Sequence, residues 1–162
     1  MKLQIIEREL KQARIADILT FFSAVLLILL FGYAAASKLT EYQRFVMTMK
    51  AAPMPFMKNA ATLLAVLVPL TEFTIVGMLL TDIWRKRGLI ASFFLLLLFQ
   101  IYIAGMLLSG LELPCSCGGV ISKLNWKEHL VFNAAFMLIA IAPLCYRRYL
   151  KTLSKEYSPR SI

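Results

Sequence analysis

Two cysteines separated by one residue are the part of this sequence best suited to chemistry. Cys115 and Cys117 are followed directly by Gly118 and Gly119. Cα atoms two residues apart lie near the upper limit that a disulfide can bridge, about 6–7 Å, so a bond here would close a small, bent ring. Such a bond is more easily reduced than a structural disulfide, and the glycines remove Cβ atoms that would obstruct a tight turn or a partner backbone. The spacing predicts a redox-active pair; the alternative is two unpaired loop thiols.

Three polar or aromatic residues follow this pair closely in the chain. Trp126 is expected to anchor the segment at a membrane interface. His129, the single histidine, could favour a cysteine thiolate as a nearby cation or donate to a quinone carbonyl; the alternative is an ordinary interfacial histidine. Asn133 lies one helical turn further on, so both side chains can face one pocket. The alternative for Asn133 is a hydrogen bond between helices.

A metal site is the competing interpretation of the cysteine pair. The plausible ligands are Cys115, Cys117 and His129, whereas a closed structural zinc site takes four ligands from the protein. We therefore predict no metal. The third cysteine, Cys145, lies beside basic residues at the other edge of the last apolar run and is expected to be a reduced, apolar helix residue.

The composition is that of a membrane protein. Of the 162 residues, 60% are hydrophobic, compared with roughly 45–50% in soluble domains. The length allows one bundle, so residues 1–162 are predicted to form a single domain in the lipid bilayer. The net charge of +9 does not indicate nucleic-acid binding, because the basic residues cluster at the ends of apolar runs, where they orient a membrane protein.

The apolar runs predict an all-α bundle of four transmembrane helices. A run of nineteen residues gives a helix of about 28 Å, enough to cross the hydrocarbon core. The charged segment 1–17 is predicted to form a short amphipathic helix at the interface that leads into the membrane. The connection 38–59 is expected to lie on the membrane surface, and the cysteine pair falls in the loop before the last span. The predicted spans are residues 18–36, 60–81, 88–108 and 130–146.

Two polar residues lie inside the predicted spans. Glu72 is near the middle of the second span and Gln100 is at a similar depth in the third. An ionisable group there costs roughly 2.5–3.5 kcal/mol, so it should face the bundle interior and have a partner. We predict that each residue makes a hydrogen bond between helices, that of Glu72 joining the second span to the third, with Glu72 neutral because burial disfavours its charged form. The alternative is a proton relay.

The distribution of lysine and arginine predicts the orientation of the chain. Twelve of the eighteen basic residues lie in the N-terminal segment, in the short loop after the second span and at the C-terminus. The positive-inside rule places these three segments, and therefore both termini, in the cytoplasm. The cysteine loop then faces the oxidising periplasmic side of a bacterial inner membrane, where a thiol pair can cycle.

Three motifs resemble those of a known family. The cysteine motif, Cys115, Cys117 and Gly118, with four spans around it, is similar to that of the methylamine-utilisation protein MauE family, within the wider DoxX-like group of small membrane proteins. The stretches 31–39, which ends in Ser-Lys-Leu, and 69–73, Pro-Leu-Thr-Glu-Phe, resemble the group's first-helix ending and second-helix acidic motif. This resemblance implies a redox-associated protein, because MauE is linked to disulfide formation in a periplasmic dehydrogenase subunit.

Two hypotheses about function follow. In the first, the protein is a thiol–disulfide oxidoreductase that passes electrons from an exported client, through Cys115 and Cys117, to a membrane acceptor such as a quinone. In the second, it is a non-catalytic membrane subunit or assembly factor, and the cysteine loop shapes a docking surface. A transporter has little support, because no sequence repeat or pair of interrupted helices indicates a substrate path.

Overall fold

The structure is a computed structural model that describes residues 2–51, 55–108 and 126–157. Within these residues the chain forms α-helices and no strand, which confirms the all-α prediction. The helices of the described part are α1 (Lys2–Thr40), α2 (Tyr42–Ala51), α3 (Pro55–Leu80), α4 (Arg85–Leu108) and α5 (Trp126–Tyr157).

Four helices of the described part are long and apolar enough to cross a membrane, so the chain is a multi-pass membrane protein. They are α1, α3, α4 and α5, which correspond to the four predicted spans, the second of which was predicted to end one residue beyond α3. The apolar segments run over Leu10–Thr40, Asn59–Leu80, Arg85–Gly105 and Lys127–Leu153. The last is longer than predicted because arginine, lysine and leucine, all good helix formers, continue α5 past its apolar run.

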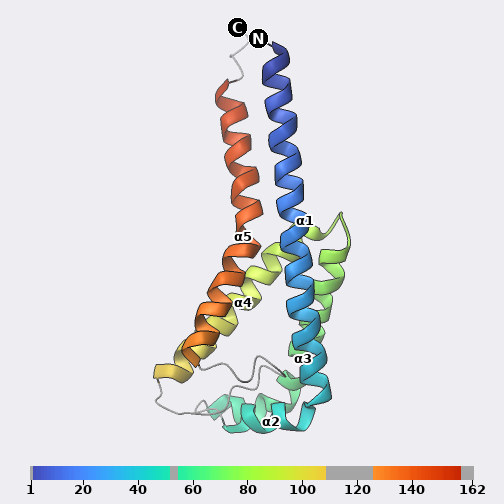
Figure 1. Cartoon of the computed structure of the whole chain (residues 1–162). Coiled ribbons are helices and arrows are strands. Elements are labelled where there is room, and N and C mark those ends of the chain that lie inside the picture. The colour runs from blue at the N-terminus through green and yellow to red at the C-terminus, as the bar shows by residue number, and fades with distance from the viewer. Residues whose placement is uncertain (1, 52–54, 109–125, 158–162) are drawn as a thin grey trace.

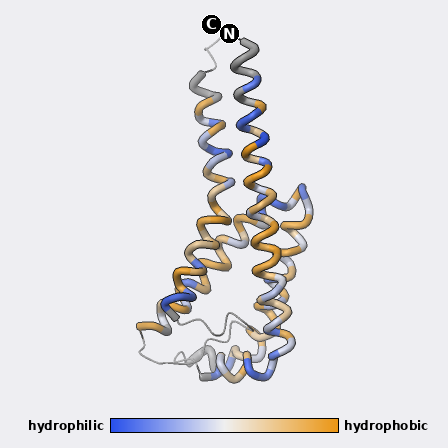
Figure 2. The backbone as a smooth tube through the Cα atoms, viewed as in Figure 1, coloured by the Kyte–Doolittle hydropathy of each residue, from blue (hydrophilic) through white to orange (hydrophobic). Residues whose placement is uncertain are grey.

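The segment 1–17 was predicted to lie at the interface, but from Leu10 onward it belongs to the first membrane-spanning segment. Helix α1 is continuous from Lys2 to Thr40, and its membrane segment begins at Leu10. The physical reason is that residues 2–31 contain neither glycine nor proline, so nothing interrupts the helical hydrogen bonds between the charged and apolar parts. The N-terminal part of α1 and the C-terminal part of α5 extend together beyond the other helices (Figure 1). Hydrophilic residues are frequent in these extensions (Figure 2).

The bundle is held together by apolar packing between α1, α3, α4 and α5. Helix α1 packs mainly against α3, and α4 mainly against α5. The buried centre contains Leu27 and Phe31 of α1, Leu79 of α3, and Leu89 and Leu96 of α4. The short turn between α3 and α4 lies at the end of the bundle that faces the two termini (Figure 1). The three basic segments that predicted the orientation therefore lie toward the same end of the bundle, with the start of α1 and the end of α5 extending beyond the turn (Figure 1).

The connection predicted to lie on the membrane surface contains a helix. Helix α2 crosses the bundle at the end opposite the termini (Figure 1). It is packed against α3, with Phe45 and Val46 of α2 buried on Ala61 and Ala65 of α3. The alanines lack long side chains and therefore let α2 approach closely. Helix α2 therefore covers part of the bundle at the end where α4 stops and α5 begins.

Candidate functional site

The cysteine motif lies outside the described residues. Cys115, Cys117, Gly118 and Gly119 belong to the stretch 109–125, which connects the last residue of α4, Leu108, to the first residue of α5, Trp126. Both helix ends lie at the end of the bundle opposite the termini (Figure 1). The third cysteine, Cys145, is a free thiol in α5 and is exposed, so it does not contribute to the buried core.

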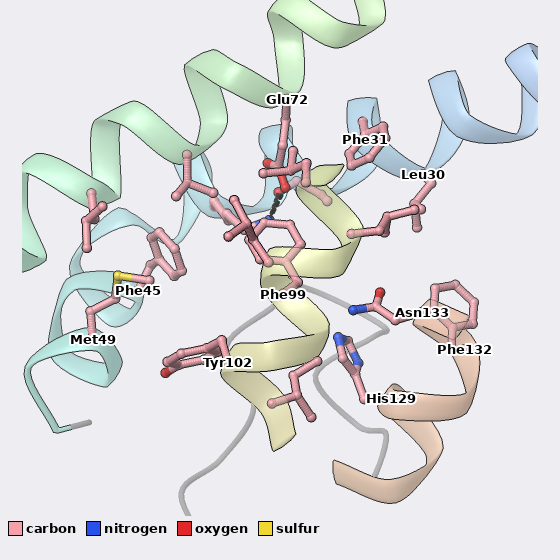
Figure 3. Close-up of a pocket in the computed structure, with 18 residues that line it drawn as sticks. Leu30, Phe31, Phe45, Met49, Glu72, Phe99, Tyr102, His129, Phe132 and Asn133 are labelled. Atoms are coloured by element: carbon pink, nitrogen blue, oxygen red, sulfur yellow. Dashed lines mark hydrogen bonds and ion pairs between the residues drawn. The ribbon is translucent and has the colours of Figure 1, made fainter. Parts of the chain in front are cut away.

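His129 and Asn133 share one face of α5, as their spacing predicted. Both side chains are buried, with 4% and 5% of their surface exposed, and both line the same internal chamber. Figure 3 shows them approaching the chamber from α5, one turn apart. They are in the first turns of the helix, so they follow the cysteine segment closely in the chain.

This chamber is an apolar cavity of about 340 Å³ between the helices. Its volume is within the roughly 300–1,000 Å³ that is typical of ligand pockets. Side chains from all five described helices line it, and most of them are aliphatic or aromatic. The aromatic members are Phe31, Phe45, Phe99, Tyr102 and Phe132, and the other polar members are Lys38, Glu72, His129 and Asn133.

A buried ion pair joins α1 to α3 at the chamber wall. Lys38 Nζ lies 2.7 Å from Glu72 Oε1, and the two side chains are 4% and 1% exposed. The ammonium group also donates to the carbonyl oxygen of Ala34 at 3.4 Å, which shows that the side chain runs back along α1 into the bundle. The rings of Phe99 and Phe45 flank it, with centroids 5.7 Å and 6.0 Å from Nζ. These contacts replace the water that Lys38 would have at the surface.

The structure overturns the predicted partner of Glu72 and confirms the predicted inter-helix hydrogen bond of Gln100. Glu72 was expected to form a hydrogen bond with the third span, but its partner is Lys38 of α1. Gln100 donates to the carbonyl oxygen of Leu130 at 3.2 Å and so links α4 to α5. Lys38 was assigned to a surface connection, because it follows the predicted end of the first span by two residues. The sequence did contain a signal for this pair, because a lysine at the end of one span can be the partner of a buried carboxylate in another span.

Three buried polar atoms of the chamber lining have no hydrogen-bond partner among the described residues. They are Glu72 Oε2, His129 Nδ1 and Asn133 Nδ2. A buried donor or acceptor left without a partner costs about 1–3 kcal/mol. The chamber therefore offers an amide donor, an imidazole nitrogen and a carboxylate oxygen to whatever occupies it.

The fold and the site define a multi-pass helical membrane protein with a buried ion pair and a mostly apolar chamber at one end of the bundle. Comparison with known families gives a more specific result: the model of the family described as "Methylamine utilisation protein MauE" matches residues 16–146. The match includes every membrane-spanning helix at least in part, all of the chamber lining and the cysteine motif. The chain therefore belongs to the MauE family, as its motifs indicated. No curated protein and no solved structure matches it.

Proposed function

We propose that this MauE family protein is a membrane thiol–disulfide oxidoreductase that introduces disulfides into an exported client through Cys115 and Cys117. The proposal is supported by the spacing of the two thiols, which favours a readily reduced disulfide. The main supporting observation is the position of this motif in the chain. Its segment joins α4 to α5 directly before the turns that bring His129 and Asn133 to the chamber.

The proposed reaction exchanges one disulfide for another. A client thiolate attacks one sulfur of the Cys115–Cys117 disulfide, which forms a mixed disulfide and releases the other cysteine as a thiolate. A second client thiolate then attacks the mixed disulfide, so the client gains an S–S bond and both protein cysteines become reduced. To restart the cycle, the two cysteines lose two electrons and two protons to a quinone in the membrane, which becomes a hydroquinone. The protein disulfide forms again.

The orientation of the chain must place the cysteines in an oxidising compartment. The start of α1, the α3–α4 turn and the end of α5, which carry most of the basic residues, lie toward the same end of the bundle (Figure 1). The positive-inside rule then supports a cytoplasmic location for that end and a periplasmic location for the cysteine segment. Reporter fusions after Tyr149 should be cytoplasmic, and fusions at Lys123 should be external. A cytoplasmic Lys123 fusion would contradict the proposal.

Serine substitutions test the redox role directly. Cys115→Ser and Cys117→Ser should each abolish client oxidation while expression and membrane insertion are unchanged, because serine is nearly isosteric with cysteine. Removing the resolving cysteine should also trap a mixed disulfide with the client, visible as a reducible band of higher mass. Cys145→Ser is the matched control and should behave like the unmodified protein. If the Cys115→Ser, Cys117→Ser double variant still supports full client oxidation, the protein is a non-catalytic subunit.

A further inference from the structure

We infer that the chamber between the helices binds the head group of a quinone, held by polar side chains at two parts of its wall. The redox step of this inference rests on the proposed function, but the binding site does not. Its basis is the coexistence of a mostly apolar cavity of about 340 Å³ and several buried polar groups that face it. A quinone combines an apolar ring with carbonyl oxygens that accept hydrogen bonds.

Water alone does not suit this chamber. A water molecule occupies about 30 Å³ in the liquid, so the cavity has space for about ten. Buried waters are stable where they have two to four polar partners each, but most of the lining here is aliphatic or aromatic. A ligand whose body is apolar and whose polar atoms are few and separated fits this lining better.

The positions of the polar groups suit a ligand with two acceptors. Asn133 Nδ2, which has no partner in the described part of the chain, supplies a donor from α5, and His129 lies one turn before it. Lys38 supplies an ammonium group from α1, held in place by Glu72. In Figure 3 Glu72, the partner of Lys38, and the two α5 side chains approach the chamber from different sides. One carbonyl oxygen of a quinone would accept from Asn133 and the other from Lys38, while Phe99 offers a ring surface to the quinone ring.

The chamber also has access to the membrane, where quinones dissolve. Leu98 of α4 lines the chamber and is 63% exposed on the outside of the bundle. In a membrane-spanning helix this outer surface faces lipid. The isoprenoid or alkyl tail of a quinone could therefore remain in the bilayer while its head group enters the chamber. Two electrons and two protons from the Cys115 and Cys117 thiols would convert the bound quinone to a hydroquinone as their S–S bond forms.

The experiment measures binding of decylubiquinone to the full chain in lipid nanodiscs. The protein carries Cys115→Ser and Cys117→Ser, so thiol chemistry cannot affect the result. We expect saturable binding that decylbenzene, which has the same alkyl chain and no carbonyl groups, does not displace. Asn133→Leu should weaken binding about tenfold, the effect of losing one buried hydrogen bond. Ser92→Ala is the matched control, because Ser92 is buried in α4 away from the chamber lining, and it should leave the affinity unchanged.

A second variant covers the case in which Asn133→Leu does not fold. Ala34 lines the chamber, so Ala34→Leu fills part of the cavity without removing a polar group and should abolish decylubiquinone binding in a folded protein. Absence of saturable binding, equal displacement by decylbenzene, or unchanged affinity in the folded variants would overturn the inference. If quinone binds but the cysteines are dispensable for client oxidation, the proposed function fails and the site remains. If the cysteines are essential but no quinone binds, the proposed function remains and this site fails.

Discussion

Removing either partner of the buried ion pair should destabilise the protein strongly, whereas removing both should not. At 2.7 Å between Lys38 Nζ and Glu72 Oε1, Coulomb's law gives an attraction of about 6 kcal/mol at an effective dielectric constant of about 20. This attraction is offset by the several kcal/mol needed to take each ion out of water. The intact pair is therefore close to neutral for stability, but a single buried charge is not.

The loss of unfolding free energy in each single variant has an upper limit, because the unpaired buried group can become neutral instead of keeping its charge. At pH 7 this costs about 4.6 kcal/mol for an ordinary lysine and about 3.7 kcal/mol for an ordinary glutamate. We expect Glu72→Leu, which leaves Lys38 unpaired, to reduce the free energy of unfolding by about 4 kcal/mol. Lys38→Met, which leaves Glu72 unpaired, should reduce it by about 3 kcal/mol. The double variant should be within about 1 kcal/mol of the unmodified protein, since two apolar side chains replace the pair.

The assay is reversible unfolding in mixed micelles with increasing SDS, followed by far-ultraviolet circular dichroism. The four proteins form a double-mutant cycle, which isolates the interaction between the two side chains. Arg44→Met is the matched control: its pair with Glu41 is 3.4 Å long and solvent-exposed, so its loss should cost at most about 1 kcal/mol. The reasoning is refuted if the double variant loses as much as the two single variants together, or if Glu72→Leu alone is harmless.

Two further predictions use the same unfolding assay. Gly88→Ala should reduce the free energy of unfolding by about 1–3 kcal/mol through overpacking, because its Cβ would lie 3.0 Å from Leu79 Cδ2 and 3.2 Å from the Leu79 backbone nitrogen. Gly32→Ala is the control: its Cβ would meet nothing within 4 Å, so stability should be unchanged or increase by up to about 1 kcal/mol. Equal effects of the two substitutions would contradict the packing argument. Arg147→Met, which breaks a 2.6 Å pair with the largely exposed Asp17, should lose about 0.2–1 kcal/mol, and a loss above about 2 kcal/mol would show that this contact between α1 and α5 is stronger than its exposure indicates.

The membrane-spanning architecture could be predicted from the sequence because it depends on local properties. In lipid every backbone polar group needs a partner within the protein, so an apolar run of about twenty residues must be helical. Three of the four predicted spans accordingly lie inside one helix each, and the second, 60–81, ends one residue beyond α3. The continuity of α1 was also present in the sequence, in the absence of glycine and proline between its charged and apolar parts. The shared face of His129 and Asn133 followed from their spacing of four residues.

The tertiary structure alone decided which polar groups meet. Lys38 and Glu72 are 34 residues apart, and no local pattern states that α1 and α3 bring them to one place. Gln100 likewise has its partner in α5, through the carbonyl oxygen of Leu130. The chamber depends on side chains from all five described helices, so it exists only when they are packed together. Hydropathy and spacing act along one helix, whereas the pairing of buried charges and the shape of a cavity depend on which helix faces meet.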